Sequence, residues 1–162
     1  MLPAGRGTIT PDAGARRGAS DEVSRVQQAG AGAAGAGTDA ARSVGIGLIG
    51  IGFMGGIHAR AYRNAPWIFP DAAQPDIRVV ADARLEDARA FAERFGIPEW
   101  TDDWRTLLGR ADVEVVDVCT PPALHRRMAT EAAEAGKHVY CEKPVGRGLD
   151  ETAAIWEAVQ RA

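Results

Sequence analysis

The stretch GIGLIGIGFMGG, residues 45–56, joins a short apolar run to the first turn of a helical pattern. At the junction, Gly50, Gly52 and Gly55 form the pattern G-x-G-x-x-G. Between a strand and a helix, the first glycine allows a tight turn, the second lets the backbone approach a diphosphate, and the third lets the helix pack closely on the strand. The pattern predicts dinucleotide binding at this turn, with Phe53 and Met54 among the contacts. The alternative is a glycine-rich turn in an α/β protein that binds no ligand.

Around this stretch, apolar runs typical of buried strands alternate with patterns typical of amphipathic helices. The expected strands are residues 44–50, 77–82, 113–120 and 138–141. The expected helices are residues 53–63, 85–95 and 123–135, followed by a last helix that Asp150 caps and that faces inward through Ile155, Trp156 and Val159. Residues 64–76 are expected to form a proline-rich surface loop, and residues 100–109 a short edge strand or turn and a short helix.

Strands that are apolar almost throughout and separated by helices indicate a parallel sheet covered on both faces. The expected fold is therefore an α/β fold with a doubly wound, Rossmann-like parallel sheet. With 162 residues, 46% of them hydrophobic, the chain is long enough for one domain of ordinary size. We assign residues 44–162 to this domain. Residues 1–43, rich in glycine and alanine and without aromatic side chains, are expected to form a disordered leader.

The composition excludes several classes of partner. The net charge is −3, and acidic and basic residues are mixed along the chain without the polybasic block typical of nucleic-acid binding. No window approaches the length of about 18 continuous apolar residues that a membrane span requires. Cys119 and Cys141 lie in separate apolar runs without a metal-ligand spacing around them. We therefore expect reduced thiols, no metal site, no nucleic-acid or membrane partner, and a cytoplasmic protein.

Asp82 ends the second expected strand, at the place where dinucleotide-binding folds carry an acidic residue. A carboxylate there accepts hydrogen bonds from the ribose hydroxyls of the adenosine and repels a 2′-phosphate, which favours NAD. Arg84, two residues later, would instead bind that phosphate and favour NADP. NAD is the expected cofactor and NADP the alternative. Without a ligand, Asp82 would be a simple helix N-cap.

Two further polar turns leave strands at the same expected edge of the sheet. Thr120, Pro121 and His125 follow the third strand, and Glu142 and Lys143 follow the fourth. Ligands of open α/β sheets bind outside the carboxyl ends of the strands, so both turns are candidate parts of the site. The alternatives without a ligand are a loop with a helix-opening proline and a solvated pair of opposite charges.

Residues 44–162 resemble the N-terminal part of the Gfo/Idh/MocA family, the glucose-fructose oxidoreductase, inositol dehydrogenase and rhizopine-catabolism family. The resemblance rests on four stretches in the family's order: GIGLIGIGFMGGIHA, VADARLEDARAFAERFG, VDVCTPPALH and AGKHVYCEKPV. The Glu-Lys-Pro element, residues 142–144, is the most specific of them. The resemblance implies an NAD(P)-dependent oxidoreductase that transfers hydride between nicotinamide and a sugar or cyclitol hydroxyl.

The resemblance also implies roles for single residues. Lys143 corresponds to a lysine beside the nicotinamide and the reacting hydroxyl, where it positions the hydroxyl and stabilises the developing alkoxide. Glu142 corresponds to a residue that helps to hold the nicotinamide side of the cofactor, and Pro144 fixes the turn. A lysine suits this role because burial and a nearby positive ring lower its pKa towards the working pH.

Thr120, Pro121 and His125 correspond to the lining of the nicotinamide-ribose region, and His58 to a position with a packing role. Members of the family continue into a second α/β domain over the substrate, and this sequence lacks both that domain and the last strand of the first. The expected partner is a sugar or polyol, and an oligomer is expected only if the missing domain is supplied. The alternative is a non-catalytic dinucleotide-binding module, a sensor or half of a split enzyme.

Overall fold

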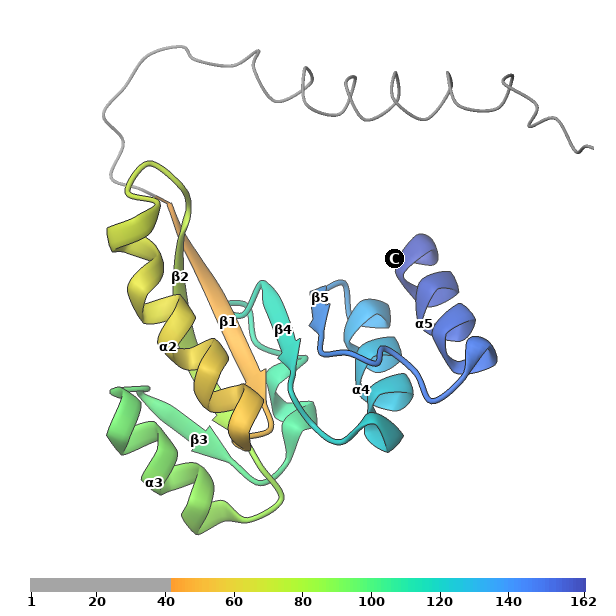
Figure 1. Ribbon diagram of the computed structural model, residues 1–162, viewed down its shortest axis with the longest axis horizontal. Coiled ribbons are helices and arrows are strands. Elements are labelled where there is room, and N and C mark those ends of the chain that lie inside the picture. The colour runs from red at the N-terminus through yellow and green to blue at the C-terminus, as the bar shows by residue number, and fades with distance from the viewer. Residues whose placement is uncertain (1–41) are drawn as a thin grey trace, which may run out of the picture. The chain divides into compact units, whose positions relative to one another are not determined.

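The computed structural model describes residues 42–162 (Figure 1). Almost all of the expected leader lies outside these residues, and its last residue, Ser43, belongs to the first strand. In chain order the elements are β1 (Ser43–Ile49), α2 (Phe53–Ile68), β2 (Gln74–Ala81), α3 (Leu85–Phe95), β3 (Glu99–Thr101), the 3-10 helix η1 (Trp104–Leu107), β4 (Val115–Val118), α4 (Pro122–Glu134), β5 (His138–Cys141) and α5 (Leu149–Arg161).

The strands form one parallel sheet in the order β3-β2-β1-β4-β5. The central strand β1 pairs with β2 on one side and with β4 on the other. This arrangement matches the first five strands of the order 3-2-1-4-5-6 that is typical of doubly wound dinucleotide-binding folds. A sixth strand is not found within residues 42–162. The predicted fold class is confirmed.

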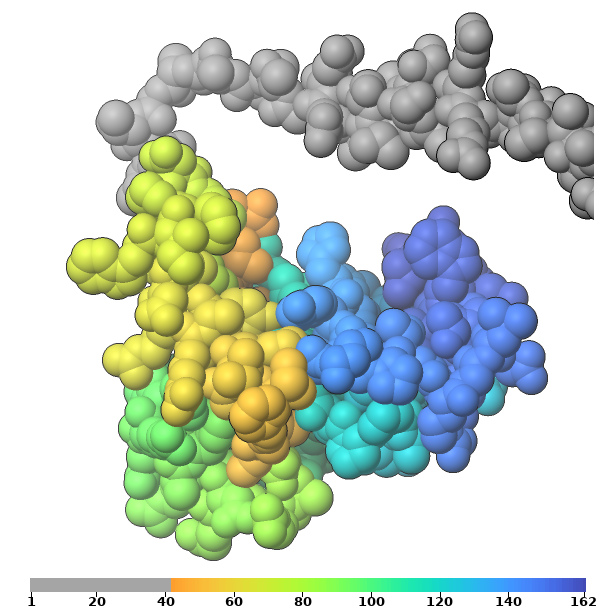
Figure 2. Space-filling view, in the orientation of Figure 1, coloured from red at the N-terminus to blue at the C-terminus, as the bar shows by residue number. Residues whose placement is uncertain are grey.

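Helices cover both faces of the sheet. On one face α2 and α3 pack on β2 and β3, and on the other α4 packs on β4 and β5 while α5 packs on α4 (Figure 1). Neighbouring residues of β1 therefore enter different cores: Leu48 is buried among residues of α2 and α3, and Ile49 among residues of α4. Figure 2 shows α5 at the surface beside α4. A strand buried on both faces explains the nearly continuous apolar runs in the sequence.

The proline-rich stretch is shorter than predicted. Helix α2 continues through Pro66 to Ile68, and β2 begins at Gln74, so the loop between them is confined to a few residues. A proline removes one hydrogen bond to the preceding turn, and this loss is compatible with two further helical residues. The expected loop over residues 64–76 is therefore wrong for its first five residues, which belong to α2.

The last helix also differs from the prediction at two points. Gly148 is the N-cap of α5, so Asp150 lies in its first turn, where a carboxylate interacts favourably with the helix dipole. Ile155 is buried as predicted, but Trp156 is 63% exposed and Val159 41% exposed because the buried stripe passes through Ala158 instead. Within residues 42–162, no helix has both the length and the apolar character that crossing a membrane requires.

Candidate functional site

A cavity of about 460 Å³ opens at the edge of the sheet where β1, β2 and β4 end. Its size is within the range of pockets that bind small molecules. The walls come from the glycine turn, the ends of β2 and β4, the segment after β3 and the start of α4. The lining residues are Ile49, Gly50, Ile51, Gly52, Ala81, Asp82, Ala83, Arg84, Asp87, Asp102, Trp104, Cys119, Thr120, Pro121, Leu124 and Met128.

The three glycines have the geometry that the pattern predicts. Gly50 has a φ of 94°, a left-handed conformation that favours glycine, and its N–H donates to the carbonyl oxygen of Ala81 at 2.8 Å. A Cβ at Gly55 would lie 2.0 Å from the carbonyl oxygen of Gly50, so the close contact between helix and turn requires a glycine. A Cβ at Gly52 would meet no protein atom within 4 Å. The turn therefore leaves open space at the residue that a diphosphate is expected to approach.

Helix α2 begins directly after this open space. Gly52 is its N-cap and gives no side-chain cap, and the first turn contains no acidic residue. The first N–H groups of the helix and the positive end of its dipole are therefore available to an anion. Phe53 is exposed, and Met54 packs partly against the core beneath α2. Neither side chain lines the cavity, so contacts of Phe53 and Met54 with a cofactor would come from their backbone.

Asp82 joins the end of β2 to the glycine turn. Its carboxylate accepts hydrogen bonds from the backbone N–H of Ile51 at 3.4 Å and from that of Arg84 at 3.2 Å. The N-cap of α3 is Arg84, so Asp82 is not a simple helix cap. Arg84 lines the cavity, but its Nε forms an ion pair with Asp87 at 2.6 Å. With Asp102, the cavity is lined by three carboxylates and one already paired cation.

Some residues that follow β4 line the cavity, and others are buried in the protein interior. Thr120 and Pro121 line the cavity, and α4 begins at Pro122, where proline is well tolerated. His125 is 0% exposed, with Nε2 at 2.7 Å from the carbonyl oxygen of Thr120 and Nδ1 at 3.0 Å from that of Pro144. His125, which was expected to line the nicotinamide-ribose region, therefore does not line the cavity. Its ring lies beneath the two turns because both offer it backbone acceptors.

Glu142 and Lys143 leave β5 at the same edge of the sheet as the glycine turn. The N–H of Glu142 donates to the carbonyl oxygen of Val118 at 3.0 Å, which extends the β4–β5 ladder by one residue. Its side chain is only 13% exposed, so this carboxylate is not part of a solvated ion pair. Lys143 is exposed, in contrast to the burial that its expected role implies, and no ion pair of its ammonium group is found among residues 42–162. The peptide bond between Lys143 and Pro144 is cis.

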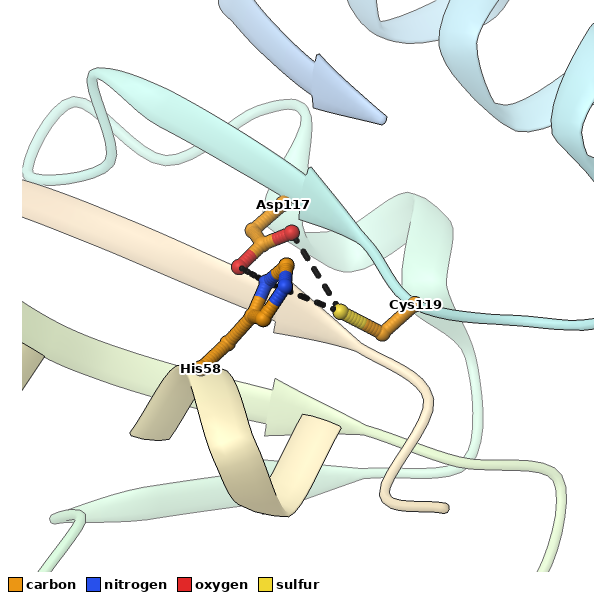
Figure 3. Close-up of side chains that lie close together, drawn as sticks. All are labelled: His58, Asp117 and Cys119. Carbon is orange, nitrogen blue, oxygen red and sulfur yellow. Dashed lines mark hydrogen bonds and ion pairs between the residues drawn. The ribbon is translucent and has the colours of Figure 1, made fainter. Parts of the chain in front are cut away.

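A buried polar cluster lies beneath this edge, and the sequence analysis missed it. His58 from α2, Asp117 from β4 and Cys119 at the end of β4 point toward one another (Figure 3). Nδ1 of His58 lies 2.8 Å from Oδ2 of Asp117 and 3.2 Å from Sγ of Cys119. Tyr62 donates from its hydroxyl to the same oxygen of Asp117 at 2.8 Å. The available signal was an aspartate in the middle of an otherwise apolar strand, because a buried carboxylate requires partners.

The charge of Asp117 affects its neighbours. Burial, and then the carboxylate of Asp117, raise the pKa of the Tyr62 hydroxyl and of the Cys119 thiol well above their ordinary values. The same two causes raise the pKa of the Cys141 thiol to about 11. All three groups are therefore protonated at neutral pH, and Tyr62 and Cys119 donate to Asp117.

The cluster has the composition of a metal site, and its atoms also form a hydrogen-bonded network. One nitrogen, one oxygen and one sulfur of His58, Asp117 and Cys119 lie within 4.8 Å of one another. The separations of 2.8 and 3.4 Å that Asp117 makes with the other two are those of hydrogen bonds. We therefore interpret the cluster as structural or positioning machinery.

The fold and the turns match a known family. The family model described as an oxidoreductase family with an NAD-binding Rossmann fold (GFO_IDH_MocA) matches residues 44–162. The chain belongs to this Gfo/Idh/MocA family. The predicted family is confirmed, and NAD is confirmed as the cofactor of the family's Rossmann domain.

Several members of the Gfo/Idh/MocA family are similar in sequence. Levoglucosan dehydrogenase of Pseudarthrobacter phenanthrenivorans is 45% identical over 120 residues, which are 74% of this chain and 31% of that protein. Myo-inositol 2-dehydrogenase of Thermotoga maritima is 30% identical over 117 residues, 72% of this chain and 33% of that protein.

Solved structures of the family show the same fold. A levoglucosan dehydrogenase in complex with NADH and levoglucosan has a TM-score of 0.71 at 45% identity, over 74% of this chain and 32% of that one. GenD2 from gentamicin A biosynthesis, in complex with NAD, has a TM-score of 0.67 at 28% identity, over 80% of this chain and 35% of that one. The chain thus spans about a third of the length of the relatives that it matches. The roles of single residues stay predictions.

Proposed function

We propose that this chain provides the cofactor-binding part of an NAD-dependent oxidoreductase that transfers hydride between nicotinamide and a sugar or cyclitol hydroxyl. The observation that carries the proposal is the arrangement of the carboxyl ends of the strands. The glycine turn, the acidic cavity and the Glu-Lys-Pro turn all lie at this one edge of the sheet. Relatives named for their action on levoglucosan and myo-inositol support a polyol substrate.

In this proposal the glycine turn binds the diphosphate of the cofactor. Gly50 and Gly55 shape the turn, and Gly52 gives the diphosphate room to approach the backbone. Phe53 and Met54 contribute the first N–H groups of α2. The structure fits this role because a side chain at Gly52 would project into open space rather than into protein.

The adenosine side of the cavity favours NAD over NADP. Asp82 is placed to accept hydrogen bonds from the ribose hydroxyls, and Asp87 and Asp102 add negative charge to the same cavity. Arg84, the residue that would bind a 2′-phosphate, is already paired with Asp87. A 2′-phosphate would therefore be repelled by three carboxylates, and the arginine that would bind it is already paired.

On the nicotinamide side, Thr120 and Pro121 form the wall of the cavity, and Lys143 faces the reacting groups. A cofactor held here would supply the hydride acceptor, and Lys143 would orient the substrate hydroxyl and stabilise negative charge on its oxygen. Glu142 and Pro144 position the backbone from which the Lys143 side chain extends. His125 supports the two turns from below rather than lining the site.

A chimera tests this proposal. Residues 44–162 would replace the corresponding part of the levoglucosan dehydrogenase of P. phenanthrenivorans, and NADH formation would be followed with a panel of sugars and cyclitols. We expect turnover with NAD that is lost in the Lys143→Ala chimera. NAD binding without turnover for any sugar or cyclitol would contradict the proposed reaction and favour a non-catalytic dinucleotide-binding module.

A further inference from the structure

The imidazole of His58 bridges two carboxylates that belong to different parts of the fold. Its Nδ1 lies 2.8 Å from Oδ2 of Asp117 in β4, and its Nε2 lies 3.1 Å from Oε1 of Glu142, directly after β5. The side chain of Asp117 is 0% exposed and that of Glu142 is 13% exposed. Asp117 therefore depends on the hydrogen-bond partners that the protein provides, and Glu142 has only limited contact with bulk water.

A count of donors shows how much depends on the His58 ring. Each ring nitrogen lies within hydrogen-bond distance of one carboxylate oxygen, so the ring serves both side chains as a partner. Asp117 receives further donors from Tyr62 and Cys119. Oε1 of Glu142 has the His58 ring as its partner, and Oε2 accepts from the backbone N–H of Lys143 at 3.0 Å. Loss of the ring would leave Oε1 of Glu142 without its hydrogen-bond partner.

The bridge is connected to the turn that carries Lys143. Glu142 is fixed through its backbone to Val118 and through its side chain to His58. Pro144, on the other side, offers its carbonyl oxygen to His125 at 3.0 Å. Lys143 therefore lies between two anchored residues. Its backbone is held in place, although its side chain is exposed.

We propose that His58 is a positioning residue, which holds the Glu142 carboxylate and thereby orients the backbone of Lys143 at the nicotinamide end of the site. This inference rests on the proposed function, because His58 acts on the reaction only through Glu142 and Lys143. The buried Asp117 has the task of holding the His58 ring in the orientation that reaches Glu142. The sequence resemblance alone gives His58 no more than a packing role.

Packing and positioning can be separated by two substitutions that both remove the ring. The His58 ring stacks on Tyr140, with centroids 5.1 Å apart and planes 12° from parallel, and this contact disappears in either variant. Asparagine places its amide nitrogen about as far from Cβ as Nδ1, and glutamine about as far as Nε2. His58→Asn thus keeps a donor for Asp117, whereas His58→Gln keeps a donor for Glu142.

The test is hydrogen exchange at the backbone N–H of Lys143, measured by NMR in the 162-residue chain without cofactor. We expect exchange about tenfold faster in His58→Asn, because Glu142 loses its anchor, and within about threefold of the unaltered chain in His58→Gln. Stability should show the reverse order, with a thermal midpoint about 5 °C lower in His58→Gln than in His58→Asn. Equal exchange at Lys143 in both variants would overturn the proposal.

A second measurement applies if neither His58 variant folds. Glu142→Gln leaves α2 and β4 untouched, and the ring nitrogens of His58 can be followed by their ¹⁵N chemical shifts. We expect the Nε2 resonance to move and the Nδ1 resonance to stay. An unchanged Nε2 resonance would show that the bridge to Glu142 does not exist in solution.

The two proposals fail in different ways. Neither the exchange measurement nor the ¹⁵N shifts require a cofactor, so both test the His58 bridge even if the unaltered chain binds no NAD. Absence of NAD binding, measured by calorimetry on the same sample, would contradict the proposed function alone. Normal NAD binding together with a failed bridge test would contradict the role of His58 alone.

Discussion

Gly52→Ala is expected to remove most of the affinity for NAD without unfolding the protein. The backbone at Gly52 is extended, with φ −62° and ψ −163°, so it lies outside the positive-φ region that favours glycine, and a Cβ there would meet no protein atom within 4 Å. The methyl group would instead occupy the space through which the diphosphate reaches the start of α2. Loss of one charge-assisted hydrogen bond costs about 1.5–3 kcal/mol, which corresponds to an affinity about 10- to 150-fold lower.

Gly56→Ala is the matched control for this experiment. Its Cβ would also meet no protein atom within 4 Å, but it lies one turn further along α2, beyond the glycine turn. Alanine in the helix should stabilise the fold by about 1 kcal/mol and leave the affinity unchanged. Calorimetric titration with NAD and circular dichroism would be applied to both variants. Equal affinity in the two variants would refute the assignment of the glycine turn to the diphosphate.

Three further predictions concern the rest of the site. Asp82→Ala and Asp87→Ala should both shift the cofactor preference towards NADP. The first removes a carboxylate that repels the 2′-phosphate, and the second releases Arg84 from its ion pair. An unchanged ratio of the dissociation constants of NAD and NADP would contradict the role of the acidic cavity in cofactor selectivity. In the chimera, Lys143→Ala should abolish turnover while the dissociation constant of NAD stays within about threefold, and full turnover would clear Lys143 of a catalytic role. Because the pKa of Cys141 is raised to about 11, its thiol is neutral at pH 8. Its alkylation by iodoacetamide should therefore be slower than that of glutathione, and should accelerate as the pH rises towards about 11. An alkylation rate equal to that of glutathione at pH 8 would contradict the raised pKa.

The elements and the glycine turn could be predicted because their signals are local. A glycine directly after an apolar strand indicates a turn, and Gly50 has the φ of 94° that such a turn requires. The predicted bounds of β5 match the observed ones because an apolar run ends at Glu142. The errors came where a neighbour decides the outcome. Trp156 has the spacing of a buried residue, but α4 packs against the stripe through Ile155 and Ala158 instead. Periodicity identifies a helix more reliably than it identifies which stripe the neighbouring helix covers.

The His58 cluster was missed for a different reason. His58 and Asp117 are separated by 59 residues, and His58 and Glu142 by 84, so no spacing rule brings them together. The contact arises only because β4 and β5 are parallel neighbours in the sheet and His58 of α2 reaches the ends of both. Asp117 nevertheless indicates such a cluster, because an ionisable side chain within a buried strand requires a hydrogen-bond partner on a neighbouring element.

Helix α2 links the two ends of the proposed site. Its N-terminus follows the glycine turn, and His58 lies on the same helix between the sheet and the Glu-Lys-Pro turn. The close contact of Gly55 with the carbonyl oxygen of Gly50 sets the distance between this helix and the sheet. That distance in turn determines whether the His58 ring can reach both Asp117 and Glu142. In the proposed site Gly55 would therefore serve two purposes: it would let the helix N-terminus approach the diphosphate, and it would bring His58 close enough to hold the turn that carries Lys143.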